Sequence, residues 1–196
     1  MAVCSVVRTF RHIRILQIGP RPYDFFTTMC NEGELLEKFH VELSPIPLPE
    51  LTKEMKKAIE ENTEVAETIS YIKENMTVKL NDQELQNVAA LKVAMKHLIV
   101  KYGCQAGAIQ CWNALQDELE IMPCAANSLL NEEGIPVVCE TDIHGAITAL
   151  MVEAAALDGT RSFFADWTIR HPDIPNGELL QHCGPWPISV AKEKPT

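Results

Sequence analysis

Two carboxylate side chains follow two consecutive predicted strands of this sequence, each at the position where its strand ends. Glu140 comes directly after the apolar run at residues 135–139, and Asp166 comes directly after the run at residues 162–165. Neighbouring parallel strands lie about 4.8 Å apart, so carboxylates at adjacent strand ends can share one cation or one substrate. Oxygen ligands of this kind suit Mg²⁺ or Mn²⁺.

An imidazole beside these carboxylates would shift the preference of the site toward a transition metal. His182 is the best candidate, because it follows the short apolar pair at residues 179–180. His144 falls in the first turn of a predicted helix, where a neutral imidazole can simply form a hydrogen bond. His171 precedes a proline in a predicted loop. We therefore expect His182 to be the third metal ligand.

Both carboxylates also have simpler structural explanations. Glu140 would place a negative charge near the N-terminus of a helix, where it complements the helix dipole. Asp166 would accept hydrogen bonds from the backbone amides of a turn. Cys139 ends an apolar strand and is interpreted as a buried, unreactive thiol. The sequence contains no G-x-G-x-x-G, Walker, G-x-S-x-G or H-E-x-x-H motif, so the placement of the two carboxylates is what favours a site.

The order of the predicted elements is that of an α/β protein with a doubly wound, flavodoxin-like parallel sheet. Residues 13–18 form an apolar run stopped by Gly19 and Pro20, which is typical of a buried strand that enters a loop. Strands that alternate with helices form right-handed βαβ units, and the sheet is then covered on both faces. Further strands are predicted at residues 41–43, 106–110, 135–139 and 162–165, and helices at residues 23–39, 51–72 (one or a pair), 85–98, 125–133 and 141–157.

Loops at the same edge of the predicted sheet supply further candidates. In an open parallel sheet, ligands bind outside the carboxyl ends of the strands. Arg21 follows the first predicted strand, and Trp112 and Asn113 follow the middle one. We therefore expect these three side chains to bind the substrate.

Charge and cysteine content exclude several classes of protein. The 196 residues carry a formal net charge of −10, of which residues 102–196 carry −9, and nucleic acids and anionic membranes both require a basic face. Seven scattered cysteines without a C-x-x-C pair favour neither a disulfide framework nor a thiolate zinc site. No segment approaches the ~20 apolar residues of a membrane helix. The N-terminus lacks the pattern of a secretory signal, so we expect a cytoplasmic protein.

The most specific motifs of the chain are residues 140–146 (ETDIHGA), 163–168 (FFADWT) and 182–185 (HCGP), accompanied by residues 18–22 (IGPRP) and 109–112 (IQCW). Together and in this order they resemble the core of the L-fucose isomerase and related-protein family, which is allied to the L-arabinose isomerases. The resemblance covers most of the chain and is thin only between residues 51 and 101. It implies an aldose–ketose isomerase that uses a divalent metal, usually Mn²⁺.

The resemblance also implies roles for individual residues. Glu140 and Asp166 match the two metal-binding carboxylates of the family, which transfer a proton between C1 and C2 of the sugar through an enediol. His182 matches a histidine ligand of the arabinose branch, although the sequence around it differs. The implied partners are a small-molecule aldose or ketose and further copies of the chain in a homo-oligomer.

Family enzymes have three domains, and this chain resembles only the middle one, expected at residues 1–166. Residues 167–196 are rich in proline and are expected to be an extended or irregular tail, the start of a missing C-terminal domain. Two functions therefore stay open: an aldose–ketose isomerase, and a truncated, non-catalytic α/β sugar-binding or assembly module of the same family. A sugar-responsive regulator is a weaker third alternative, because no basic segment resembles a DNA-binding element.

Overall fold

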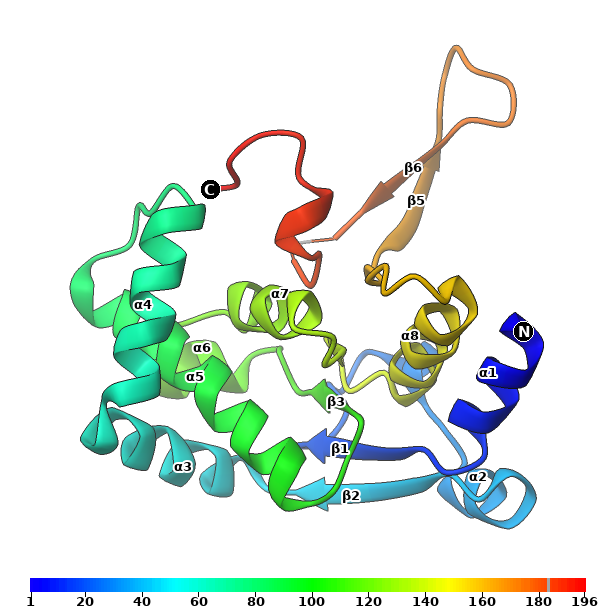
Figure 1. Cartoon of the computed structure of the whole chain (residues 1–196), viewed down its shortest axis with the longest axis horizontal. Helices are drawn as coiled ribbons and strands as arrows, with labels where there is room; N and C mark the ends of the chain where they lie inside the picture. The colour runs from blue at the N-terminus through cyan, green and yellow to red at the C-terminus, as the bar shows by residue number, and fades with distance from the viewer. Residues whose placement is uncertain (183) are drawn as a thin grey trace.

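A computed structural model describes residues 1–182 and 184–196 of the chain. At its centre is a four-stranded parallel sheet with the strand order β2-β1-β3-β4 (Figure 1). The strands are β1 (Arg14–Ile18), β2 (Glu42–Ile46), β3 (Ala106–Ile109) and β4 (Val137–Val138). The fold is a doubly wound α/β fold with a flavodoxin-like strand order, which confirms the prediction from the sequence.

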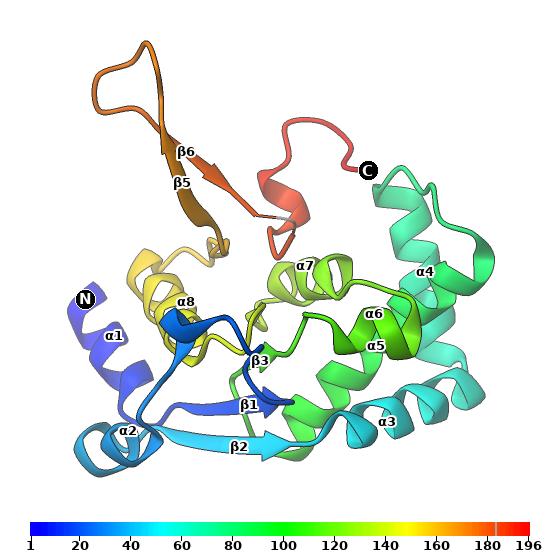
Figure 2. The ribbon, with the colours of Figure 1, turned by 180° about the vertical axis from the view of Figure 1, so that it is seen from behind.

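Helices cover both faces of the sheet and enclose a hydrophobic core on each (Figures 1 and 2). One face is covered by α3 (Leu48–Glu61), α4 (Thr63–Asn75), α5 (Asp82–Lys101), α6 (Ala114–Leu119) and α7 (Cys124–Glu132). The other face is covered by α1 (Ala2–Phe10), α2 (Glu32–Phe39) and α8 (Ile143–Ala156). Successive side chains of a strand point to opposite faces, so Leu16 enters the first core and Ile15 the second.

The predicted helix at residues 23–39 is wrong in its first half. A loop with a 3₁₀ turn at Phe26–Thr28 comes first, and α2 begins only at Glu32. The side chain of Asn31 caps this helix, because it accepts a hydrogen bond from the backbone N–H of Glu34. The cap, rather than the aromatic residues before it, determines where the helix begins.

The prediction of a fifth parallel strand at residues 162–165 is also wrong. This described segment pairs with no strand of the sheet, and both the N–H and the hydroxyl of Ser162 donate to the Glu153 carboxylate, at 2.9 and 2.8 Å. The Phe163 ring packs against Trp186 with 4.6 Å between ring centroids. The apolar run therefore packs against the body through its side chains, although Phe163 stays 46% exposed, while β4 is too short to offer a long edge for pairing.

A hairpin follows this segment and projects from the body of the molecule (Figures 1 and 2). It consists of β5 (Asp166–Arg170) and β6 (Glu178–Gln181), which pair antiparallel outside the main sheet. The chain then returns to the body, where Pro185 and Pro187 are buried and a 3₁₀ turn spans Ile188–Val190. The division of the chain at residue 166 stays a prediction. Among the described residues, no helix combines the length and the apolar character needed to cross a membrane.

Candidate functional site

Glu140, Asp166 and His182 come together beside the carboxyl end of β4. One ligand atom from each side chain lies within 4.8 Å of the other two, and Nε2 of His182 is 3.5 Å from Oε1 of Glu140. Glu140 follows β4, Asp166 is the first residue of β5, and His182 follows β6. The structure thus places the three predicted ligands together, although Asp166 and His182 reach the site from the hairpin rather than from the sheet. Two carboxylates and an imidazole at this spacing could hold a divalent metal ion.

The backbone at Glu140 has an uncommon conformation that its neighbours hold in place. Glu140 and Thr141 have φ angles of +63° and +51°, in the left-handed region that non-glycine residues rarely occupy. The N–H of Glu140 donates to Sγ of Cys111 at 3.3 Å, and its carbonyl accepts a hydrogen bond from the Thr28 hydroxyl at 3.3 Å. The Thr141 hydroxyl donates to the carbonyl of Pro20 at 3.1 Å. Such backbone strain concentrates at functional sites, where surrounding contacts maintain it.

The imidazole of His182 is enclosed, with only 3% of its side chain exposed. Its ring meets Phe164 edge to face, with 5.0 Å between ring centroids, and its Nδ1 accepts a hydrogen bond from the N–H of Gly184 at 3.3 Å. In the neutral ring this bond leaves the proton on Nε2, which faces Glu140. Burial lowers the pKa of His182, but the hydrogen bond and charge of Glu140, with the charge of Asp166, outweigh burial and raise the pKa.

The solvent reaches this cluster mainly at one ligand. The side chain of Glu140 is 13% exposed, whereas Asp166 is an exposed residue at the base of the hairpin. Glu140 and His182 therefore form the enclosed part of the site, and Asp166 forms its open side.

The three predicted substrate contacts lie on the loops that support Glu140. The guanidinium of Arg21 donates to the carbonyls of the next two residues, both at 2.8 Å, and so is held within its own loop. Trp112 is half-exposed and lies near Phe25, with 6.4 Å between ring centroids. Asn113 is exposed and directly precedes α6. Their role in substrate binding stays a prediction.

The alternative side chains considered from the sequence lie outside the cluster. His144 is exposed on α8, and Nδ1 of His171 accepts hydrogen bonds from the backbone amides two and three residues later. Cys139 is fully buried. Hydrogen bonds with the Cys111 and Cys124 thiols, together with burial, raise the pKa of Cys139, as expected of an unreactive thiol.

The side chains that hold the turn of Glu140 in place were not identified from the sequence. The turn that carries Glu140 is hydrogen-bonded by Thr28 and Cys111, and Thr141 within this turn donates to the loop at Pro20. Cys111 and Thr141 fall within the motifs at residues 109–112 and 140–146, but the three residues belong to separate loops, so no local spacing connects them with one another. Cys183, which belongs to the motif at residues 182–185, lies outside the described residues.

No family model matches the chain. It is 28% identical to a protein named sulfoquinovose isomerase from Alkalicoccus urumqiensis, over 192 residues that cover 97% of this chain and 42% of that protein. A protein of the same name from Priestia megaterium is 28% identical over 189 residues, covering 96% of this chain and 42% of the relative. A third, from a Clostridium species, is 25% identical over 191 residues, covering 96% and 41%.

The chain thus spans about two-fifths of the length of the curated relatives that it matches. Their name is that of an aldose–ketose isomerase of a sugar, the class of enzyme that the motifs of this chain resemble. It is not the name of an L-fucose or L-arabinose isomerase. The comparisons therefore agree with the expected class of enzyme and leave the expected sugar unsupported.

Proposed function

We propose that this chain forms the α/β part of a sugar isomerase that interconverts an aldose and a ketose with the help of a divalent metal. The observation that carries the proposal is the convergence of Glu140, Asp166 and His182 within 4.8 Å. The name shared by the relatives supports the class of reaction. Because the chain spans about two-fifths of those relatives, both its activity and its substrate belong to the proposal.

The donor set fits Mn²⁺, which accepts carboxylate oxygens together with an imidazole nitrogen. Glu140, Asp166 and His182 would hold the ion, for which the His182 ring would have to give up the proton on Nε2, and the exposed position of Asp166 leaves one side open for a sugar. A divalent cation in this position would withdraw electron density from the sugar's carbonyl oxygen and adjacent hydroxyl oxygen, which makes the C–H bond between them more acidic.

The two carboxylates are assigned to proton transfer. One carboxylate removes the proton from C2 of the aldose; the electrons of that bond form the C1–C2 double bond of an enediolate, while the π electrons of the C1=O1 bond move to O1. Return of a proton to C1, with movement of the O2 proton to O1, then gives the ketose. Without the ion, His182 faces Glu140 through Nε2 and so keeps that carboxylate oriented.

The substrate class has two sources of support that point to different sugars. The motifs resemble isomerases of L-fucose and L-arabinose, whereas the relatives are named for sulfoquinovose. Arg21, Trp112 and Asn113 are the proposed sugar contacts, because their loops adjoin the turn that carries Glu140. A panel of these three sugars therefore tests the substrate directly.

The experiment follows solvent deuterium into C2 of each sugar by NMR, in D₂O with Mn²⁺. We expect slow exchange that is lost in Glu140→Gln and Asp166→Asn, with little net ketose. Turnover is expected to be poor because three donors leave about half of an octahedral coordination sphere to water and Asp166 faces solvent. Binding of a sugar without exchange at C2 would favour the alternative, a non-catalytic sugar-binding or assembly module. Rapid ketose formation by this chain would contradict the expected open site.

A further inference from the structure

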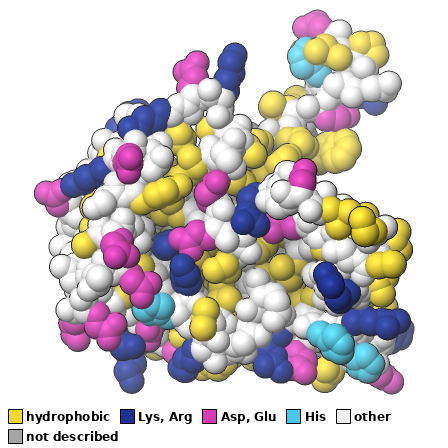
Figure 3. Space-filling model, in the orientation of Figure 1, with side chains coloured by type: hydrophobic (Ala, Val, Ile, Leu, Met, Phe, Trp, Pro, Cys, Tyr) yellow, Lys and Arg dark blue, Asp and Glu magenta, His cyan; other side chains and the backbone are white. Residues whose placement is uncertain are grey.

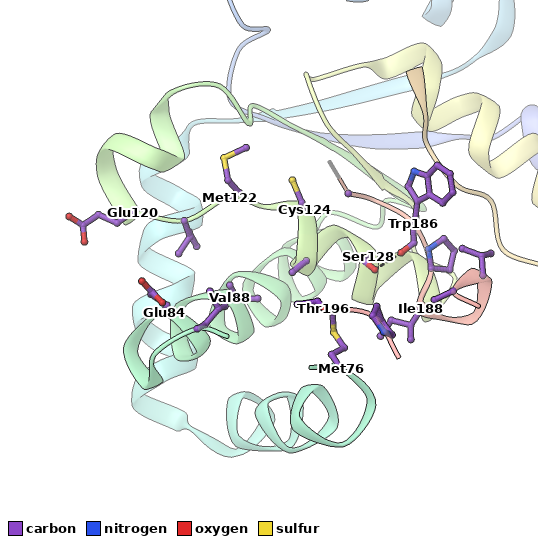
Figure 4. Close-up of a pocket in the computed structure, with 18 residues that line it drawn as sticks. Met76, Glu84, Val88, Glu120, Met122, Cys124, Ser128, Trp186, Ile188 and Thr196 are labelled. Carbon is purple, nitrogen blue, oxygen red and sulfur yellow. Dashed lines mark hydrogen bonds between the residues drawn. The ribbon is translucent and has the colours of Figure 1, made fainter. Parts of the chain in front are cut away.

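The segment that follows His182 is attached to one face of α7. The hydroxyl of Ser128 donates to the carbonyl of Trp186, and Nδ2 of Asn131 donates to the carbonyl of Pro185 at 2.6 Å. Figure 4 shows Ser128 directed toward the backbone of Trp186. Ser128 and Asn131 are three positions apart on the helix, so they share a face, and both are buried.

Asn131 also connects this segment to the sheet. Its Oδ1 accepts a hydrogen bond from the N–H of Val137, the first residue of β4, at 2.8 Å. The same carboxamide therefore binds the strand that leads to Glu140 and the segment that follows His182. Asn131 is 2% exposed, and a buried polar group that loses its hydrogen-bond partner destabilises the fold, so the folded chain keeps both hydrogen bonds.

Gly184 connects the segment attached to α7 with the imidazole of His182. Its N–H donates to Nδ1 of His182, and its backbone lies so close to α7 that an added Cβ would come within 2.9 Å of Cα of Cys124. The position of His182 thus depends on how residues 184–186 sit on α7.

We propose that Ser128 and Asn131 are positioning residues for the candidate metal site. They hold residues 184–186 on α7 and thereby keep Nε2 of His182 beside Glu140. This inference rests on the proposed function for its metal, but its geometry involves only residues of the chain. Residues that orient metal ligands from outside typically change metal affinity by about 10–100-fold when they are replaced.

The first test is a titration of the chain with Mn²⁺, followed through the EPR signal of the free ion. We expect Ser128→Ala and Asn131→Ala to weaken binding by about 10-fold. Ser70→Ala is the matched control, because it removes a hydroxyl that donates within α4 at 2.9 Å, and it should leave the affinity unchanged. Ser128→Thr retains the hydroxyl and faces a cavity of about 620 Å³, so it should restore the affinity (Figure 4).

The second test separates positioning from a general loss of structure. If Ser128 and Asn131 act through His182, their substitution should cause no further loss of Mn²⁺ affinity in a His182→Ala background. An equal loss with and without His182 would overturn the proposal.

The third test needs no metal and stays informative if the proposed function fails. The ¹⁵N resonances of the His182 ring, assigned by their absence in His182→Gln, report which nitrogen carries the proton at alkaline pH. The wild-type ring should carry the proton on Nε2. In Ser128→Ala and Asn131→Ala, a larger fraction of the rings should carry it on Nδ1. Unchanged resonances in both variants would overturn the positioning role. Failure of the wild-type chain to bind Mn²⁺ would contradict the proposed function, and the ring resonances would still decide the positioning.

Discussion

Nε2 of His182 lies 3.5 Å from Oε1 of Glu140, although the two residues belong to different substructures. Glu140 follows the edge strand of the parallel sheet, and His182 follows the last strand of a hairpin outside it. Asp166, the first residue of that hairpin, completes the cluster. The candidate site is thus the junction of the hairpin with the sheet, and its geometry depends on how the hairpin is anchored.

The hairpin is expected to bring copies of the chain together. Its described residues are exposed on both strands, including Trp167 at 75% and Ile169 at 62%, and Figure 3 shows hydrophobic side chains on this projection. An isolated two-stranded hairpin is only marginally stable in water, and exposed apolar patches promote association. We expect sedimentation velocity to show concentration-dependent self-association that Trp167→Lys and Ile169→Lys reduce.

Val100→Lys is the control for self-association, because Val100 is 69% exposed near the end of α5, away from the hairpin. This variant should associate like the wild-type chain. A chain that stays monomeric at every concentration would contradict association through the hairpin.

Gly184→Ala should destabilise the chain, because its added methyl group would collide with Cys124 at the start of α7. Overpacking of this kind costs about 1–3 kcal/mol of unfolding free energy, measured by urea denaturation. Gly33→Ala is the contrasting change: its Cβ would come no closer than 3.5 Å to a neighbour within α2, so it should stabilise the chain by about 0.4–1 kcal/mol. Wild-type stability of Gly184→Ala would show that this segment does not pack on α7.

The two glutamates beside His97 are expected to make the stability of the fold depend on pH. Nδ1 of His97 lies 3.1 Å from Glu54 and its Nε2 lies 3.0 Å from Glu64, so it connects α5 to α3 and α4. Burial lowers the pKa of His97, but hydrogen bonds to Glu64 and Glu54 outweigh burial and raise it. Because the folded pKa is higher than the unfolded one, the stabilisation is complete below about pH 6.5 and is lost as pH rises through the folded pKa.

The substitution His97→Gln isolates this contribution. In urea denaturation at about pH 5.5 it should lower the unfolding free energy by about 0.5–1 kcal/mol, and by less at about pH 8.5. An equal loss at the two pH values would show that the charged imidazole does not stabilise the fold.

The central strands and the main helices could be predicted because each carries its own local pattern. The run at residues 13–18 is a buried strand, and α5 has an apolar period ended by Gly103 in a left-handed conformation. The apolar run at residues 162–165 misleads, because strand pairing and side-chain packing produce the same pattern.

The sequence could predict which residues form the candidate site, but not how the fold brings them together. The sequence indicates Glu140, Asp166 and His182, yet the expected route, through consecutive parallel strands, differs from the observed one through the hairpin. The hydrogen bonds of Asn131 with Pro185 and of Glu140 with Cys111 join elements far apart in the chain, and no local period records such contacts.

Binding of Mn²⁺ by Glu140 and Asp166 is tested most directly by titration calorimetry on the wild-type chain and on Glu140→Gln and Asp166→Asn. Exposed carboxylates elsewhere supply matched controls, Glu118→Gln and Asp173→Asn. We predict weak binding at one site that each site substitution abolishes and neither control affects, because each removes one of the two negatively charged donors that hold the ion. Tight binding that survives both Glu140→Gln and Asp166→Asn would show that the metal binds elsewhere and would contradict the account.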